Sequence, residues 1–300
     1  MQWDWSSILS YLDAWRTRAE RAHASVSDDG DLDAELADAT PDAQGPALRH
    51  RRAWCGLSSL ANPARDVAFA KSIGLTGLDI IANDHSAARE PRRFDIRPTQ
   101  QIVTLATMAR DAGLDVHLMS WIMPHRSYLI EAAEQLPDLV EKTGALSVCF
   151  DAEEPWTLAK KRLNYLEAGQ LVDALFRDRN FELGVTGIRY AATHKLAPLI
   201  AVCDYVVPQA YSTSTSKASP STVVSKGVAT WRKKFGNGPR MVAGLAAYRQ
   251  SGIKGHTTRS AMQAAIDDAE QHTDEVVYWS LNSLRKSPAA AAVVRSMSQT

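Results

Sequence analysis

The sequence Ala145–Trp156, ALSVCFDAEEPW, decides how the rest of this chain is interpreted. Its apolar run Leu146–Phe150 is bounded by a glycine and a proline, and its β-branched and aromatic residues predict a buried strand. Residues two apart on a strand share one face, so Asp151 and Glu153 are expected to project side by side. Crowded carboxylates separate in pKa, so that one serves as an acid while its neighbour stays charged. The alternative is a pair of exposed loop acids, or acids paired with Arg or Lys.

From Arg52 onward, strand-like and helical stretches alternate. The strands are expected at 53–60, 77–84, 115–121, 146–153, 181–188, 204–212, 240–248 and 275–284. The helices are expected at 63–73, 99–112, 127–142, 164–178, 191–201, 221–235, 259–272 and 288–297. This rhythm predicts an α/β fold, a closed (β/α)8 TIM barrel with an N-terminal helical extension. An open doubly wound sheet would carry a glycine-rich phosphate loop after its first strand, where this chain reads SSLANPA.

The first 48 residues differ in composition from the rest. Residues 1–22 carry an apolar stripe at helical spacing, and an acidic stretch rich in small residues follows. We therefore expect an amphipathic helix and an acidic linker over 1–48, and the barrel over 49–300. The helix either packs on the barrel or docks on a protein partner or a second copy of the chain.

Composition limits the partners. The chain has 34 basic and 34 acidic residues, so no general nucleic-acid or anionic-membrane partner is expected. No apolar run approaches the roughly 20 residues that span a bilayer, and the start does not resemble a secretory signal. Its three cysteines are expected to be reduced core residues. Without CxxC or HExxH spacing, and with only His117 and His125 near strand ends, neither a metal nor a cofactor is expected.

The carboxyl ends of the strands form the active-site face of such a barrel. Read at these ends, the candidate site residues are Asn83, Asp84, Trp121, Asp151, Glu153, Gln209, Tyr211, Tyr248, Trp279 and Asn282. Aromatic faces stack on sugar rings while carboxylates and amides bond hydroxyl groups, so this set indicates a neutral polyhydroxylated substrate. No strand end supplies the lysine of a Schiff-base aldolase.

Three short motifs carry a family resemblance. The D-x-E of Asp151 and Glu153, the QAY of 209–211 and the YW of 278–279 resemble glycoside hydrolase barrels that cleave N-acetylated polysaccharides. These are the family 18 chitinases and the family 25 lysozymes. The chain departs from the first at Leu146 and Cys149, where family 18 enzymes carry further acids. It departs from the second in its first strand, where WCGLS lacks an aspartate.

The resemblance implies a hydrolase of peptidoglycan or of a chitin-like polymer. Glu153 is the candidate general acid, and Asp151 would raise the pKa of Glu153 and orient the substrate's own N-acetyl group. Tyr211 would bond the acetamido oxygen, and Trp279 would form a stacking floor. Sugar hydroxyls would be positioned by Gln209, Asn83 and Asp84.

Two alternatives stay open. The barrel could be a catalytically inactive glycan-binding or structural component of a larger assembly, such as a phage or a contractile injection particle. It could also be an isomerase or lyase, which a metal or phosphate dependence would favour. A cell-wall substrate lies outside the cytoplasm in which a chain without a signal peptide is made. Release at lysis, or delivery by a particle, would reconcile the two.

Overall fold

The computed structural model describes residues 48–83, 94–96, 99–152, 163–188, 193–211, 219–235, 238–248 and 255–297. The expected N-terminal helix and all of its linker except Leu48 lie outside these residues, as do Asp84 and Glu153. From residue 48 onward the described chain alternates between strands and helices, in the order that the sequence predicts.

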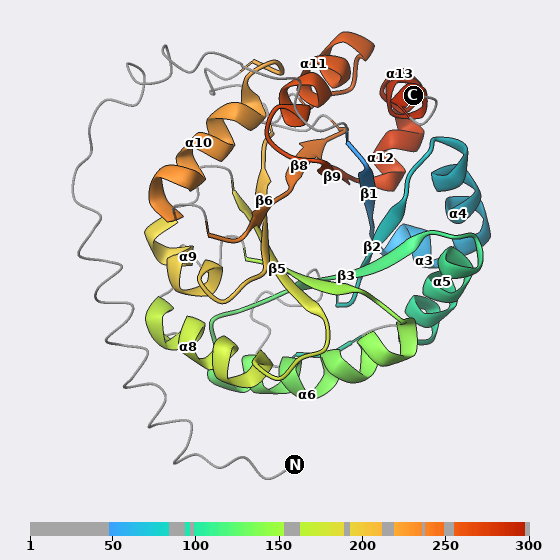
Figure 1. Cartoon of the computed structure of the whole chain (residues 1–300). Coiled ribbons are helices and arrows are strands. Elements are labelled where there is room, and N and C mark those ends of the chain that lie inside the picture. Colours follow the sequence, from blue (N-terminus) through green and yellow to red (C-terminus); the bar gives the residue numbers. More distant parts are fainter. Residues whose placement is uncertain are drawn as a thin grey trace. The chain divides into compact units, whose positions relative to one another are not determined.

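Nine strands of the described chain form one parallel sheet that closes on itself (Figure 1). Their bounds are β1 His50–Cys55, β2 Gly77–Ile81, β3 Asp115–Trp121, β4 Ser147–Asp151, β5 Glu182–Ile188, β6 Tyr205–Gln209, β7 Arg240–Met241, β8 Ala243–Ala246 and β9 Glu275–Trp279. β1 pairs with both β2 and β9, and β5 pairs with β6, so the ring is complete. β7 and β8, separated only by Val242, share one position, which makes the barrel eight-stranded.

The helices lie on the outside of this sheet and follow the strands around it (Figure 1). Their bounds are α3 Leu57–Leu60, α4 Pro63–Ser72, α5 Thr99–Asp111, α6 Arg126–Thr143, α8 Tyr165–Phe176, α9 Thr193–Ile200, α10 Val223–Phe235, α11 Arg259–Glu270, α12 Leu281–Lys286 and α13 Pro288–Ser296. The predicted (β/α)8 TIM barrel is therefore confirmed.

The passage from α6 into β4 illustrates how the sequence sets these elements. Along α6 the buried residues include Leu129, Ala132 and Leu136, spaced three and four apart, so one face of the helix packs on the sheet. The helix ends at Gly144, which adopts a left-handed conformation with φ of 62°, where a residue with a Cβ would be strained. All five residues of β4 are buried, as expected for a strand covered on both faces.

The strands divide their side chains between two apolar regions. On β4, Phe150 points outward and packs its ring 5.4 Å from that of Phe176 on α8. Cys149 points inward and belongs to a cluster in the barrel interior with Met119 and Val207. Since neighbours on a strand face opposite sides, the inward set on β4 is Ser147, Cys149 and Asp151.

Two of the predicted strands run into segments that are helical. A strand was predicted over 53–60, but β1 ends at Cys55, and a short helix, α3, buries the adjacent residues Ser59 and Leu60, a pattern that no single strand face produces. A strand was also predicted over 275–284, but β9 ends at Trp279 and α12 follows. The buried leucines of α12, Leu281 and Leu284, lie three apart, which is helical spacing.

Gly184 should be essential for packing the barrel interior. It lies directly across from Tyr205 in the β5–β6 pairing, and a Cβ on it would overlap the Tyr205 ring, which is fully buried. We expect Gly184→Ala to lower the free energy of unfolding by about 1–3 kcal/mol through overpacking. Urea denaturation followed by circular dichroism measures the change. Gly56→Ala is the control, because a Cβ there meets nothing within 4 Å. Equal stability of the two variants would contradict the packing argument.

Candidate active site

The inward side chains at the carboxyl ends of the strands form the candidate site. Trp121, Asp151, Gln209 and Trp279 are the last residues of β3, β4, β6 and β9. Each stands two residues beyond a member of the interior cluster, which comprises Met119, Cys149, Val207 and Val277 at these strands. Because residues two apart share a face, Asp151, Gln209 and Trp279 lie on the inner side of the barrel at one end. The ring of Trp121 packs with the outer core, and its centroid lies 6.3 Å from that of Tyr128 on α6.

Asp151 is the carboxylate at this end that the structure describes. Its neighbour Phe150 packs outward against α8, so the Asp151 side chain faces the barrel interior. Asp151 is 5 % exposed. In the β3–β4 pairing it lies next to Trp121, so an acid and a large aromatic side chain are neighbours at the strand ends. Its predicted partner Glu153 lies outside the described residues, as does Asp84. The pairing of the two acids therefore stays a prediction.

Cys149 lies directly below Asp151 on the same strand face, at a position where family 18 enzymes carry an acid. Burial, and secondarily the charge of Asp79, raises the pKa of the Cys149 thiol well above its usual value. The group is therefore a neutral thiol at physiological pH. Leu146, the other departure from the family pattern, precedes β4 and is exposed. Asp151 thus has no second carboxylate beneath it on β4.

Asn83 lies at the candidate site, but its side-chain amide is hydrogen-bonded to other residues of the protein. Its Nδ2 donates to the Trp121 carbonyl at 3.0 Å and to the Tyr128 hydroxyl at 2.9 Å. Its Oδ1 accepts from the Trp121 amide at 2.9 Å and from the Ser120 hydroxyl at 3.2 Å. The side chain therefore holds the end of β3, and with it Trp121, in place. Direct bonding to a sugar hydroxyl, as predicted, would require Asn83 to give up one of these contacts.

Tyr211 and Tyr248 were predicted at strand ends, but they lie two residues beyond the last residues of β6 and β8. Their ring centroids are 6.3 Å apart and the rings meet edge to face at 77°. Gly255, with φ of 59°, brings the returning chain against the Tyr248 backbone so closely that a Cβ would overlap the Tyr248 carbonyl. Apart from the glycine itself, nothing in the sequence predicts this close contact between Gly255 and the Tyr248 backbone.

Trp279 is partly buried and contacts a residue that sequence reasoning did not assign to the site. Its ring centroid is 4.0 Å from that of Trp54 on β1, at an angle of 87°. Alternation along β1 could have identified Trp54, because it shares the inward face with Arg52. The predicted position of Asn282 on a strand end is wrong: it lies on α12, and its Oδ1 accepts from Arg285 Nη2 at 2.8 Å. Arg285 in turn pairs with the buried Asp66 of α4.

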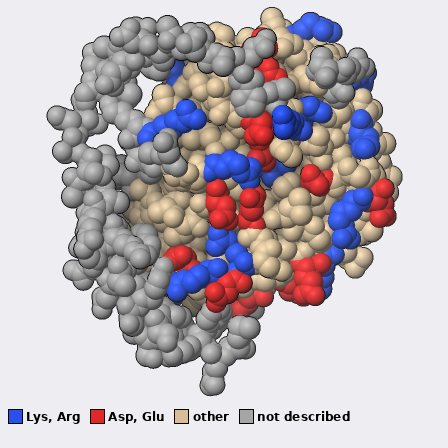
Figure 2. Space-filling view, in the orientation of Figure 1, with Lys and Arg blue, Asp and Glu red and all other residues tan. Residues whose placement is uncertain are grey.

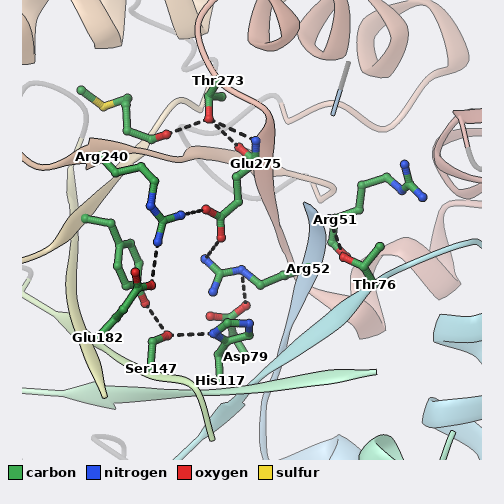
Figure 3. A network of polar contacts seen from close by, with 12 residues as sticks. Arg51, Arg52, Thr76, Asp79, His117, Ser147, Glu182, Arg240, Thr273 and Glu275 are labelled. Carbon is green, nitrogen blue, oxygen red and sulfur yellow. Dashed lines mark hydrogen bonds and ion pairs between the residues drawn. The ribbon is translucent and has the colours of Figure 1, made fainter. Parts of the chain in front are cut away.

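A second polar cluster lies at the opposite, amino end of the strands (Figure 3). Arg52 of β1 contacts Glu275 of β9 at 2.9 Å and Asp79 of β2 at 3.5 Å. Arg240 also pairs with Glu275, and it contacts Glu182 of β5 at 2.6 Å. These ion pairs join five positions around the barrel, two arginines and three carboxylates. They indicate a structural closure of the amino end.

His117, buried next to this cluster, is part of a hydrogen-bonded row. Its Nδ1 lies 2.8 Å from the Ser147 hydroxyl, which lies 2.9 Å from the Tyr205 hydroxyl. Burial, together with the positive charges of Arg52 and Arg240, lowers the pKa of His117 well below its usual value. The imidazole is therefore neutral. Among the described residues, no three His, Cys, Asp or Glu side chains gather as metal ligands.

The charged surface is mixed in sign. Figure 2 shows Asp and Glu side chains interspersed with Lys and Arg side chains over the middle of the face seen in Figure 1. This agrees with the equal numbers of acidic and basic residues. Among the helices of the described chain, none is long and apolar enough to cross a bilayer. The three cysteines are buried and free, as the sequence predicts.

No protein-family model and no curated protein matches the chain in sequence. Among solved structures it resembles a GH18 chitinase from Pseudoalteromonas aurantia, with 11 % identity and a TM-score of 0.58 over 82 % of this chain and 99 % of that one. It also resembles the spore cortex-lytic enzyme SleL of Bacillus megaterium, with 9 % identity and a TM-score of 0.53 over 84 % and 74 % of the two chains. Tryptophan synthase from M. tuberculosis follows, with 14 % identity and a TM-score of 0.52 over 85 % and 92 %.

These likenesses place the chain among TIM barrels, with the GH18 chitinase type as a distant structural relative. At such identities the fold alone is shared, and one fold supports many chemistries, as the tryptophan synthase match illustrates. The chain shares the TIM-barrel architecture of these structures. Its chemistry has to be argued from the site.

Asp79 gives the amino-end cluster a pH signature. Burial raises the pKa of Asp79 to about 6, against the opposing effect of Arg52, and its other facing group, His117, is neutral. The folded state therefore binds the proton of the Asp79 carboxyl group more tightly than the unfolded state does. The contribution of this proton to the free energy of unfolding is full below about pH 4 and is lost as the pH rises through 6. The stability of the wild type relative to Asp79→Asn should therefore rise by on the order of 2–3 kcal/mol from pH 7 to 4.

Urea unfolding of both proteins across this pH range measures the difference. Asn keeps the shape of the side chain and removes only the titration. If the stability difference between the two proteins stays constant, or falls, as the pH is lowered, the pKa of Asp79 is not raised in the folded protein.

Proposed function

We propose that this protein is a glycoside hydrolase that cleaves an N-acetylated polysaccharide, either peptidoglycan or a chitin-like polymer. The observation that carries the proposal is Asp151, an inward-facing carboxylate at the carboxyl end of β4 that is 5 % exposed and lies beside Trp121. Glu153 follows two residues later in the sequence, at the spacing that continues the same face. Trp121, Gln209 and Trp279 end other strands at the same end of the barrel, and aromatic and amide side chains suit a sugar substrate.

In the proposed mechanism Glu153 protonates the glycosidic oxygen as its bond to the anomeric carbon breaks. The acetamido oxygen of the substrate attacks that carbon from the opposite side, and Asp151 orients the amide group and balances the positive charge that develops on it. Water then opens the cyclic intermediate while the Glu153 carboxylate takes up a proton, which restores both groups. Such substrate assistance needs one acid and no second carboxylate as the nucleophile.

The other site residues would bind the sugar. Tyr211 would donate its hydroxyl to the acetamido oxygen, with its ring held against that of Tyr248 at 6.3 Å. Trp279 would stack on the face of a sugar ring, and Gln209 and Asp84 would bond hydroxyl groups. Asn83 would support Trp121, since its own amide groups are already bonded.

A second candidate function is a catalytically inactive glycan-binding or structural barrel. Cys149 favours it, because a neutral thiol stands where family 18 enzymes carry an acid below the pair. Such a barrel would keep the aromatic floor and lose turnover, and residues 1–22 would dock it in a larger assembly. In either case the protein would reach a cell wall after lysis or by delivery in a particle.

Replacing the proposed acid tests the assignment directly. We expect Glu153→Gln to lower hydrolysis of a chitin tetrasaccharide or of peptidoglycan by about 10²–10⁴-fold, because the leaving oxygen loses its proton donor. The release of new reducing ends measures the rate. Glu154→Gln is the matched control, since the sequence predicts that this neighbouring acid faces the opposite side, and it should retain wild-type activity. Full turnover by Glu153→Gln would sink the assignment, and an inert wild-type protein that still binds the oligosaccharide would favour the inactive barrel.

The role of Asp151 predicts a change in the pH profile. Asp151 must be ionised to orient the acetamido group, and its negative charge keeps Glu153 protonated. We therefore expect Asp151→Asn to lower the maximal rate, to remove the acidic limb of the profile and to move the alkaline limb to lower pH. Initial rates between pH 3 and 9 on a soluble chitin oligomer would record this. A lower rate with an unchanged profile would mean that the two carboxylates are not coupled.

A further inference from the structure

Two tryptophans pack against each other at the boundary between the barrel interior and the candidate site. Ala53 of β1 pairs with Tyr278 of β9, so Trp54 and Trp279 are the next residues along two neighbouring strands. Both point inward, and their ring centroids are 4.0 Å apart with the rings perpendicular. Trp54 lies in the interior, 2 % exposed, whereas Trp279 is only partly buried. One indole is therefore enclosed, and the other keeps part of its surface towards solvent.

Packing alone fixes the orientation of Trp54. It belongs to the interior cluster with Met119, Cys149 and Val277. Its indole Nε1 is buried and has no acceptor within hydrogen-bond distance in the described part of the chain. Most buried indole N–H groups have such a partner, so packing rather than a hydrogen bond holds this tryptophan in the interior. Its closest aromatic neighbour in the described chain is Trp279.

We propose that Trp54 is a positioning residue for sugar binding, which holds the indole of Trp279 as a fixed platform for an N-acetylated sugar ring. The inference rests on the proposed function, in which Trp279 is the stacking floor. A perpendicular ring at 4.0 Å blocks rotation of Trp279 towards the barrel axis, because the turning indole would overlap it. Trp279 is then ordered before the sugar arrives, and binding does not have to immobilise it.

The size of the effect follows from this pre-ordering. Immobilising one large side chain on binding weakens affinity by roughly 3- to 10-fold. A sugar ring stacks on Trp279 both in the ground state and in the transition state. Loss of the support should therefore raise KM for an oligosaccharide with little change in kcat.

Trp54→Phe is the variant of choice. Phenylalanine keeps an aromatic ring in the interior but is too small to reach Trp279 in the same way, and the change breaks no hydrogen bond because the indole N–H has none in the described chain. Trp231→Phe is the matched control, since Trp231 is an equally buried tryptophan on α10, in the outer core. Circular dichroism and urea unfolding verify that each variant is folded.

The experiment measures binding of a chitin tetrasaccharide by calorimetry in a Glu153→Gln background, so that turnover does not interfere. Trp54→Phe should weaken binding by roughly 3- to 10-fold, Trp279→Ala should weaken it more, and Trp231→Phe should leave it unchanged. In the double variant, Trp54→Phe should add nothing to Trp279→Ala, because its effect passes through that ring. In the active protein, Trp54→Phe should raise KM and leave kcat within about twofold.

The outcomes separate this inference from the proposed function. Unchanged affinity in a folded Trp54→Phe variant, or additive losses in the double variant, would overturn the positioning role while leaving hydrolysis intact. An inert wild-type protein whose binding still follows the expected pattern would overturn the hydrolase proposal and keep the positioning role. A wild-type protein that binds no N-acetylated oligosaccharide would overturn both.

Discussion

The structure depends on one constraint, the alternation of side chains across the strands of a closed barrel. Every strand must send one set of residues to the helices and the other to the interior, and a shift by one residue would exchange the two sets. On β4 this places Phe150 among the helices, and Ser147, Cys149 and Asp151 inside. The interior changes in character along the same strand, from a hydrogen-bonded hydroxyl through a neutral thiol to a carboxylate at the carboxyl end.

The two ends of the barrel differ in how their charged side chains are stabilised. At the amino end Arg52, Asp79 and Glu275 are nearly inaccessible to water, and such charges are tolerated only in pairs because their desolvation is costly. Ion pairs that join strands from both ends of the sequence also fix which strands meet when the ring closes. At the carboxyl end, Asp151 and the aromatic residues are held by neighbours such as Asn83. The chemistry is therefore expected at this end alone.

The sequence predicted the repeating elements well because periodicity reports burial directly. The predicted bounds of β3, 115–121, are those observed, and the predicted helical stretches differ from the observed helices by at most two residues at either end. Periodicity failed at α3 and α12, whose four and six residues are too few to establish a helical repeat within what reads as a continuous strand. The ion-pair cluster and the contact between Trp54 and Trp279 depend on residues far apart in the chain, and no local pattern identifies such partners. Strand alternation did place Asp151 on the inner face.

The arrangement at Asp151 bears on whether the barrel cuts or only binds. A binding barrel needs an aromatic floor and partners for hydroxyl groups, and an asparagine at 151 would supply such a partner without the cost of burying a charge. A carboxylate that is 5 % exposed loses most of its hydration, and this loss has to be offset by its contacts. A carboxylate at the inner end of the strand would, when ionised, stabilise positive charge that develops on a substrate, which happens in the proposed hydrolysis of an N-acetylated sugar and not in its binding.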